Sequence, residues 1–129
     1  MFENLDIFRM SSAMASHAGR RQALTAQNMA NVDTPGYRAQ RMASFADLTE
    51  SADQHPALRA TRPGHLWGSG AEVAQARITV YRSDPAPDGN TVSAEREMLE
   101  SVSAKREHDR ALAIYKSALT ILHSTLKRA

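Results

Sequence analysis

The chain has 129 residues, which is enough for one small domain but too few for two independent hydrophobic cores. Hydrophobic residues make up 42% and aromatic residues only 5%, so the core must be aliphatic and thin, which suits long helices better than a sandwich of sheets. The net charge of +2 is too small to indicate nucleic-acid binding by itself, and the absence of cysteine excludes disulfides and thiolate metal sites.

The first ten residues do not have the pattern of a secretory signal. They lack a basic segment followed by a continuous apolar run, and no later stretch is long and apolar enough to span a bilayer. We therefore expect no cleaved signal peptide, and any export of this chain must use another route.

The first predicted element is a helical arm from about Asn4 to Asn31. Its apolar side chains recur at intervals of three and four, as one face of an amphipathic helix requires. The pattern is interrupted at Arg21. The residues of this face that we expect to pair with another helix are Ile7, Met10, Met14 and Leu24.

A turn is predicted directly after this helix. Pro35 cannot continue a helix, and it restricts the backbone of Thr34 before it. Pro35 and Gly36 suit the central positions of a type II turn, because glycine tolerates the positive φ that the second of these positions requires. We assign residues 1–37 to an N-terminal arm that ends in this turn.

Residues 38–92 form an irregular middle region that contains most of the prolines and glycines. Within it, residues 45–48 are compatible with a short helical turn. Residues 78–81 are the best candidate for a strand, because Ile, Thr, Val and Tyr follow one another there.

Residues 93–129 are predicted to form a second helical arm, which carries the strongest periodic signal in the chain. Ser93 is a plausible N-cap, and Glu95 and Glu97 lie favourably at the positive end of the helix dipole. After a polar stretch over residues 105–110, apolar residues alternate by three and four over two heptads. This predicted pairing face consists of Leu112, Tyr115, Leu119, Leu122 and Leu126.

Neither arm can bury its apolar face alone, and each buried Leu or Ile contributes about 1.5–3 kcal/mol relative to exposure. The sequence therefore predicts a mainly α fold, in which the N- and C-terminal helices form an antiparallel coiled coil around an irregular, partly β middle segment. Such a pair is thin, and we expect it to order fully only beside copies or partners. An ordinary helical hairpin with a long loop is the alternative.

One segment at the end of the first arm is more specific than periodicity. Asn28 and Asn31 lie three apart on one helical face, and their amides can bind carbonyls at the helix end or on a neighbouring subunit. The segment follows the order Asn, apolar, Ala, Asn, two variable residues, Thr, Pro, Gly, Tyr. It reads Asn28-Met29-Ala30-Asn31-Val32-Asp33-Thr34-Pro35-Gly36-Tyr37.

This segment resembles the N-terminal signature of the flagellar rod, hook and hook-associated protein family. Two further stretches are similar to the proximal rod members of that family. They are residues 88–92, which read Asp-Gly-Asn-Thr-Val before Glu97 and Met98, and the set Thr61, Pro63, His65 and Leu66. A sister proximal rod subunit is the alternative within the family.

The resemblance implies a structural subunit of the bacterial flagellar basal-body rod. Terminal helices of such subunits line a hollow, torque-transmitting shaft, and the subunits pass unfolded through the flagellar type III export apparatus and assemble in the periplasm. The implied partners are copies of the chain, other rod subunits, the adaptor FliE, the membrane-embedded ring and the export apparatus. The resemblance gives the asparagines and the turn of residues 28–37 a role in assembly.

Other classes of function find less support in the sequence. The five histidines include no pair at metal-ligand spacing, and no phosphate-binding loop or nucleophile elbow is present, so we expect no enzyme, no metal site and no cofactor. Arg20 and Arg21 before a turn leave a nucleic-acid-binding module as an alternative, although no recognition helix follows. A membrane-surface helix is a third possibility, but the N-terminal arm lacks the dense basic face of such helices.

Overall fold

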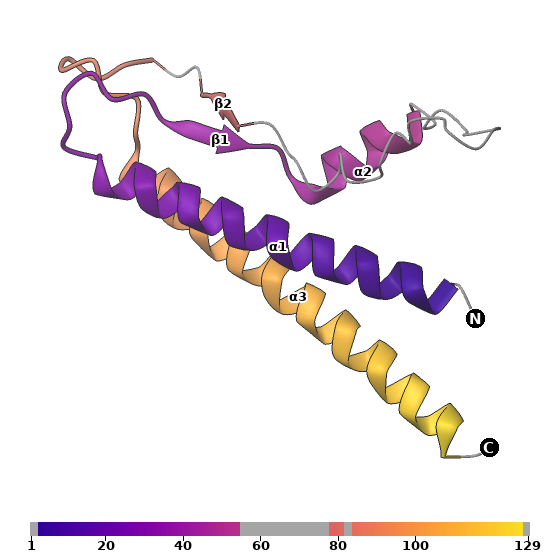
Figure 1. The fold of residues 1–129 in the computed structure, drawn as a ribbon. Helices are drawn as coiled ribbons and strands as arrows, with labels where there is room; N and C mark the ends of the chain where they lie inside the picture. The colour runs from indigo at the N-terminus through magenta and orange to yellow at the C-terminus, as the bar shows by residue number, and fades with distance from the viewer. Residues whose placement is uncertain (1–2, 55–77, 82–83, 128–129) are drawn as a thin grey trace, which may run out of the picture.

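The computed structural model describes residues 3–54, 78–81 and 84–127. Two long helices dominate the described part of the chain: α1 (Glu3–Ala30) and α3 (Ala94–Leu126). They run antiparallel side by side, so the start of α1 and the end of α3 lie at the same end of the molecule (Figure 1). The predicted mainly α fold with paired terminal helices is confirmed.

The seam between α1 and α3 is built from small and polar side chains. Ala18, Ala104 and Ala111 are fully buried, with 0% exposure, so the two helix backbones can approach closely. The other buried side chains along these two helices are mostly polar. They are Ser11, His17, Arg21, Leu24, Thr25 and Asn28 on α1 and Glu97 on α3. On α1 many of these positions repeat at intervals of three and four, the spacing of a coiled coil.

The large apolar residues of α3 lie beside this seam. Leu112 follows the buried Ala111 by one residue, which turns its side chain about 100° away from α1. Leu112 and Tyr115 are each 40% exposed and Leu126 is 72% exposed, whereas Leu119 and Leu122 are half-buried. The pairing role assigned to these five residues stays a prediction.

The predicted pairing residues of α1 divide in the same way. Leu24 is buried and Met14 is half-buried, but Ile7 and Met10 are exposed. Towards their free ends the two helices diverge (Figure 1), although Phe8 still packs edge-on against Tyr115 with 5.2 Å between the ring centres. The helix pair is therefore closed near residues 18–30 and open near the chain ends.

The described part of the middle region lies along the helix pair, mainly beside α1, and we call it the strap (Figure 1). Strand β1 (Gln40–Met42) pairs antiparallel with β2 (Ile78–Val80), with Gln40 opposite Val80. Helix α2 (Phe45–Gln54) follows β1, and the buried Phe45 packs on His17 of α1. The predicted strand is confirmed, and the predicted helical turn is longer than expected.

Several sequence predictions are not decided by this fold. Thr61, Pro63, His65 and Leu66 lie outside the described residues, and the three-part division at residues 37 and 92 stays a prediction. Ser93 occupies the N-cap position of α3, but its side chain makes no capping hydrogen bond. Over the part of the chain that the structure describes, the helices are too short or too polar to cross a membrane.

Candidate assembly site

Two segments that are far apart in the sequence join where α1 ends. We call this junction, formed by residues 31–37 and 88–91, the turn clasp. Its centre is the Asn90 side chain, which is only 3% exposed. Its Nδ2 group donates hydrogen bonds to the backbone carbonyls of Asn31, Val32 and Thr34 at 3.0, 2.7 and 3.0 Å. These carbonyls belong to the residues that follow α1, so Asn90 holds the turn after the helix in place.

Backbone contacts complete the turn clasp. The Gly36 N–H donates to the carbonyl of Asp88 at 3.0 Å, and the Thr91 N–H donates to the carbonyl of Tyr37 at 3.0 Å. Gly36 and Gly89 have φ values of 72° and 80°, and a Cβ on Gly89 would lie 3.5 Å from the Gly36 Cα. Both positions therefore require glycine because of their backbone conformation.

The predicted type II turn is present within the clasp. The Tyr37 N–H donates to the carbonyl of Thr34 at 3.2 Å, which closes the turn around Pro35 and Gly36. Positive φ at Gly36 is the feature that distinguishes type II from type I. Thr34, Pro35 and Gly36 are exposed on the surface, and Tyr37 is half-buried.

Asn28 joins the three parts of the fold. Its side chain is 1% exposed, and its Nδ2 donates to the Gln40 carbonyl at 2.8 Å while its Oδ1 accepts from the Gln40 N–H at 3.0 Å. The same amide donates to Glu97 Oε2 of α3 at 3.2 Å and accepts from the Tyr37 hydroxyl at 3.4 Å. All four hydrogen-bonding positions of a primary amide are thus used.

Asn31 has a different environment from Asn28, although both belong to the same motif. Its Nδ2 donates to the carbonyl of Gln27 at 2.8 Å, and its Oδ1 accepts from the Thr34 hydroxyl at 3.2 Å. These contacts are local and exposed, so Asn31 orders the helix end itself. Whether the Asn31 surface also meets another subunit stays a prediction.

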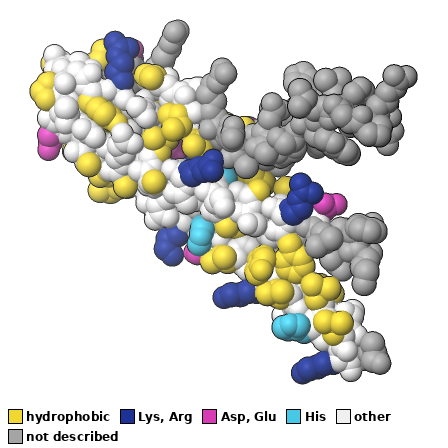
Figure 2. Space-filling model, in the orientation of Figure 1, with side chains coloured by type: hydrophobic (Ala, Val, Ile, Leu, Met, Phe, Trp, Pro, Cys, Tyr) yellow, Lys and Arg dark blue, Asp and Glu magenta, His cyan; other side chains and the backbone are white. Residues whose placement is uncertain are grey.

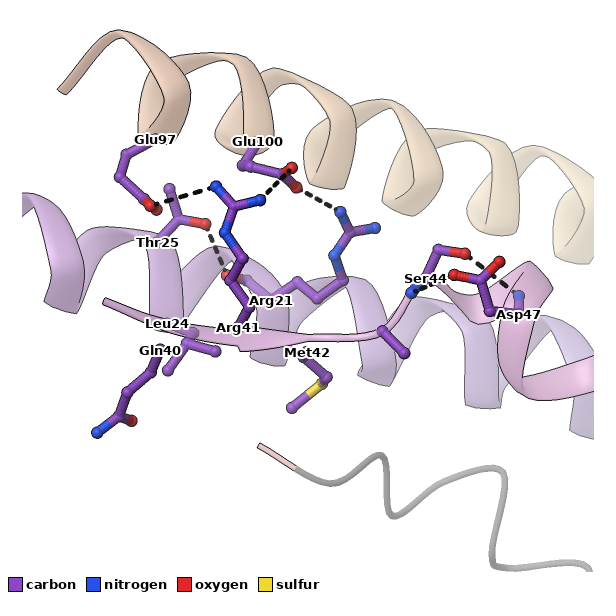
Figure 3. A pocket seen from close by; sticks show the side chains of 11 residues that line it. Arg21, Leu24, Thr25, Gln40, Arg41, Met42, Ser44, Asp47, Glu97 and Glu100 are labelled. Atoms are coloured by element: carbon purple, nitrogen blue, oxygen red, sulfur yellow. Dashed lines mark hydrogen bonds and ion pairs between the residues drawn. The ribbon is translucent and has the colours of Figure 1, made fainter. Parts of the chain in front are cut away.

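A charged cluster lies between the helix pair and β1 (Figure 3). Arg21 donates to Glu100 and to Glu107 of α3, at 2.7 Å each. Arg41 of β1 lies 3.4 Å from Glu100 and 3.8 Å from Glu97. The cluster borders a polar hollow of about 270 Å³, and the described residues include no group of three side chains suited to hold a metal ion.

The carboxylates around Arg21 stabilise its charged form. Burial alone would lower the pKa of the Arg21 guanidinium, but hydrogen bonds and attraction from Glu107 and Glu100 outweigh burial and raise the pKa above its ordinary value. The ion pairs therefore persist at any pH at which the two carboxylates are ionised.

His17 is the other buried ionisable group on α1. Within the described residues, neither ring nitrogen makes a hydrogen bond of normal geometry. Burial is the main cause that lowers the His17 pKa, and the charges of Arg21 and Arg20 lower it further. Glu107 and the backbone of Ala43 oppose this change in part. His17 thus packs against Phe45 as a neutral ring.

Sequence reasoning missed three of these roles. Arg21 was interpreted as an interruption of the apolar face, Glu97 as a helix-dipole residue, and Asn90 as part of a family likeness. The structure places all three in contacts between elements. A search for charges at heptad spacing would have found Glu100 and Glu107, which lie seven residues apart opposite Arg21.

These features define a structural subunit: its terminal helices are joined at one end by the turn clasp and leave apolar surface open at the other. No family model matches the chain. It is similar along nearly its whole length to proteins named flagellar basal body rod protein FlgB. The protein of Salmonella typhimurium is 31% identical over 98% of this chain and 93% of its own length. That of Agrobacterium fabrum is 28% identical, covering 96% of this chain and 95% of the relative. That of Buchnera aphidicola is 26% identical, covering 98% and 99%.

The chain is therefore a structural subunit of the bacterial flagellar basal-body rod. Within this class, it belongs to the FlgB family, because the identity reaches 31% with both sequences covered almost completely.

Proposed function

We propose that this rod subunit polymerises through its terminal helices into the proximal end of a hollow shaft that transmits torque. The observation that carries the proposal is the position of the apolar surface. The clasp end of the helix pair is held by buried hydrogen bonds, and the chain ends leave Ile7, Met10, Ile114 and Ile121 exposed. Nearer the clasp, α3 also exposes Met98, Leu99 and Val102, so apolar surface extends along most of this helix. Neighbouring subunits would gain the free energy of burying these side chains.

The open end also has a suitable shape. A groove of about 270 Å³ lies between α1 and α3 and is lined by Ile7, Met10, Met14 and Ile114, with Asp6 and Ser11 at its margin. A helix from a neighbouring subunit can place apolar side chains in such a groove. Because the contact joins different surfaces of the two subunits, repeating it generates a helical array.

A rod protein assembles with other flagellar components at the basal body. For this chain we propose copies of itself and other rod subunits as neighbours, with FliE and the membrane-embedded ring on the proximal side. We propose delivery through the flagellar type III export apparatus and assembly in the periplasm. The similarity to FlgB favours this assignment over FlgC or a nucleic-acid-binding module.

We propose that the subunit acts mechanically and not as an enzyme. Its relatives are named as rod proteins. The ionisable groups Arg21, Glu97 and Glu107 are used in contacts between elements of the fold. Their role is to hold the helices and the strap together.

The experiment is a deletion of the encoding gene, complemented with variants and scored by electron microscopy of basal bodies and by swimming in soft agar. We expect wild type and the surface control Thr120→Asp to restore rods and swimming. We expect Ile114→Asp, and Asn31→Ala combined with Leu119→Ala, to be exported but to fail in rod assembly. Normal rods built from Ile114→Asp would contradict assembly through the open apolar end.

A further inference from the structure

The second half of α3 carries an apolar surface that the fold of a single chain leaves open. We call it the leucine stripe, and it consists of Leu112, Tyr115, Leu119, Leu122 and Leu126. Three of its members are exposed and the other two are half-buried, with Phe8 of α1 packed on the Tyr115 ring. Figure 2 shows hydrophobic side chains gathered over this part of α3, with basic side chains and a histidine along their edge.

The spacing of the stripe indicates what kind of surface covers it. Its members alternate by three and four, so they repeat every 3.5 residues on average. This repeat keeps a seam facing a second helix that supercoils around the first. From residue 112 to residue 126 the stripe is about 21 Å long at 1.5 Å per residue. A partner helix of about two heptads can cover it.

The charges beside the stripe indicate the sign of the charge that the partner helix carries. Lys116 directly follows Tyr115, His123 directly follows Leu122, and Lys127 directly follows Leu126. Lys116 and His123 thus occupy the flanking position of the heptad whose charges choose the partner of a coiled coil. Residues 110–127 contain Arg110 and these basic residues but no Asp or Glu.

We propose that the leucine stripe binds an acidic amphipathic helix contributed by another subunit of the assembly. This inference rests on the proposed function, and it adds the chemistry of the partner. Leucine or isoleucine of the partner fills the seam, and Glu or Asp of the partner pairs with Lys116 across its edge. These ion pairs determine which partner binds more than they increase the affinity, because exposed ion pairs contribute little to the free energy of binding.

Two other occupants fit the surface less well. An anionic membrane surface would favour a broad apolar face opposite dense Lys and Arg, but Ser117, Thr120 and Ser124 lie on the polar side of this helix. A second copy of the same stripe, paired antiparallel, would place Lys116 of both copies along one edge with no Asp or Glu to pair with it, because residues 110–127 contain neither.

The test uses the full chain and two labelled synthetic helical peptides of about three heptads, with Leu in the seam and either Glu or Lys at the flanking positions. Fluorescence anisotropy at low salt gives both dissociation constants. We expect the Glu peptide to bind at least tenfold more tightly than the Lys peptide, and about 0.5 M salt to reduce this difference. Lys116→Glu combined with His123→Glu should invert the preference.

The single variant Lys116→Glu is also measured, and its matched control is Lys105→Glu, which makes the same charge change on α3 about 16 Å nearer its start, at 1.5 Å per residue. It should leave the preference for the Glu peptide unchanged. Circular dichroism checks that each variant keeps its helix content. An inverted preference cannot result from unfolding, because an unfolded variant would bind neither peptide.

Equal binding of the two peptides, or a Lys105→Glu effect equal to that of Lys116→Glu, would overturn the inference. The inference would also be overturned if anionic vesicles displaced the Glu peptide. Sedimentation that shows self-association through the stripe, in competition with the peptide, would overturn it as well. The proposed function fails separately, if the wild-type gene does not restore rods to the deletion strain while the peptide preference is intact.

Discussion

The side chain of Asn28 pairs with the backbone of Gln40 as a neighbouring strand would. The amide nitrogen donates to the Gln40 carbonyl at 2.8 Å, and the amide oxygen accepts from the Gln40 N–H at 3.0 Å. This pairing attaches the strap of the middle region to the end of α1, and the further bond to Glu97 attaches both to α3. A single buried amide thus fixes three elements at the closed end of the helix pair.

Asn28→Ala should therefore destabilise the subunit much more than Asn31→Ala. The first change leaves the buried backbone of Gln40 and the carboxylate of Glu97 without their partner, at a cost of about 2–4 kcal/mol. The second removes exposed local bonds and should cost less than about 1 kcal/mol. Urea unfolding followed by circular dichroism, at a protein concentration that gives full helicity, measures both. Equal losses would show that Asn28 does not hold the strap.

Replacing each of two glycines with alanine should change the stability in opposite directions. Gly89→Ala places a Cβ on a residue with φ of 80° and should destabilise the clasp by about 1–2 kcal/mol. Gly19 lies in the interior of α1, and nothing lies within 4 Å of the position a Cβ would take. Gly19→Ala should stabilise the helix by up to about 1 kcal/mol. Thermal melting of the two variants checks the signs, and a stabilising Gly89→Ala would refute the geometry of the clasp.

Breaking the charged cluster should be costly. Arg21→Leu leaves Glu107 without its cation and Glu100 with Arg41 alone, and because both carboxylates are partly solvated we expect a loss of about 2–4 kcal/mol. Lys105→Ala removes the exposed pair with Asp109 and should change stability by less than about 0.5 kcal/mol. Removing Glu107 together with Arg21 should restore part of the loss. The urea midpoints of the three variants measure these differences.

His17 should make stability depend on pH. Its pKa in the folded chain lies below the ordinary 6.5, so the unfolded chain binds a proton first as the pH falls. The stabilisation is complete above about pH 6.5 and is lost as the pH falls through the lower pKa of the folded chain. Between pH 8 and pH 5, the unfolding free energy of wild type should therefore fall relative to that of His17→Leu. A difference between the two chains that stays constant over this pH range would contradict the prediction.

Local pattern was enough to predict the two long helices and β2, but it did not predict β1 and indicated only the first residues of α2. The helix predicted from about Asn4 to Asn31 is Glu3–Ala30, and the strand candidate at Ile78 is β2. Pro35 ends the first arm because of its own covalent geometry, and Gly36 takes positive φ because of its missing Cβ. These features depend on neighbouring residues alone, which is why the sequence reveals them.

The seam and the clasp could not be predicted in the same way. Hydrophobic periodicity selects the largest apolar side chains, which on α3 begin at Leu112, whereas the closest approach of the helices uses Ala18, Ala104 and Ala111. The hydrogen bond from the Asn90 side chain to the Thr34 carbonyl joins residues 56 apart, and no local pattern specifies such a contact. The apolar residues left outside the seam are the surface that we propose neighbouring subunits cover.

Cysteine protection in the assembled rod tests this account most directly, because the chain has no cysteine of its own. Single variants Leu112→Cys and Ile121→Cys, with Lys105→Cys as the control, are labelled with a maleimide in the free subunit and in purified basal bodies. We expect Leu112→Cys and Ile121→Cys to react in the free chain and to be protected at least tenfold in the rod. Labelling at the same rate in both states would contradict the claim that neighbours cover the apolar surface near the chain ends.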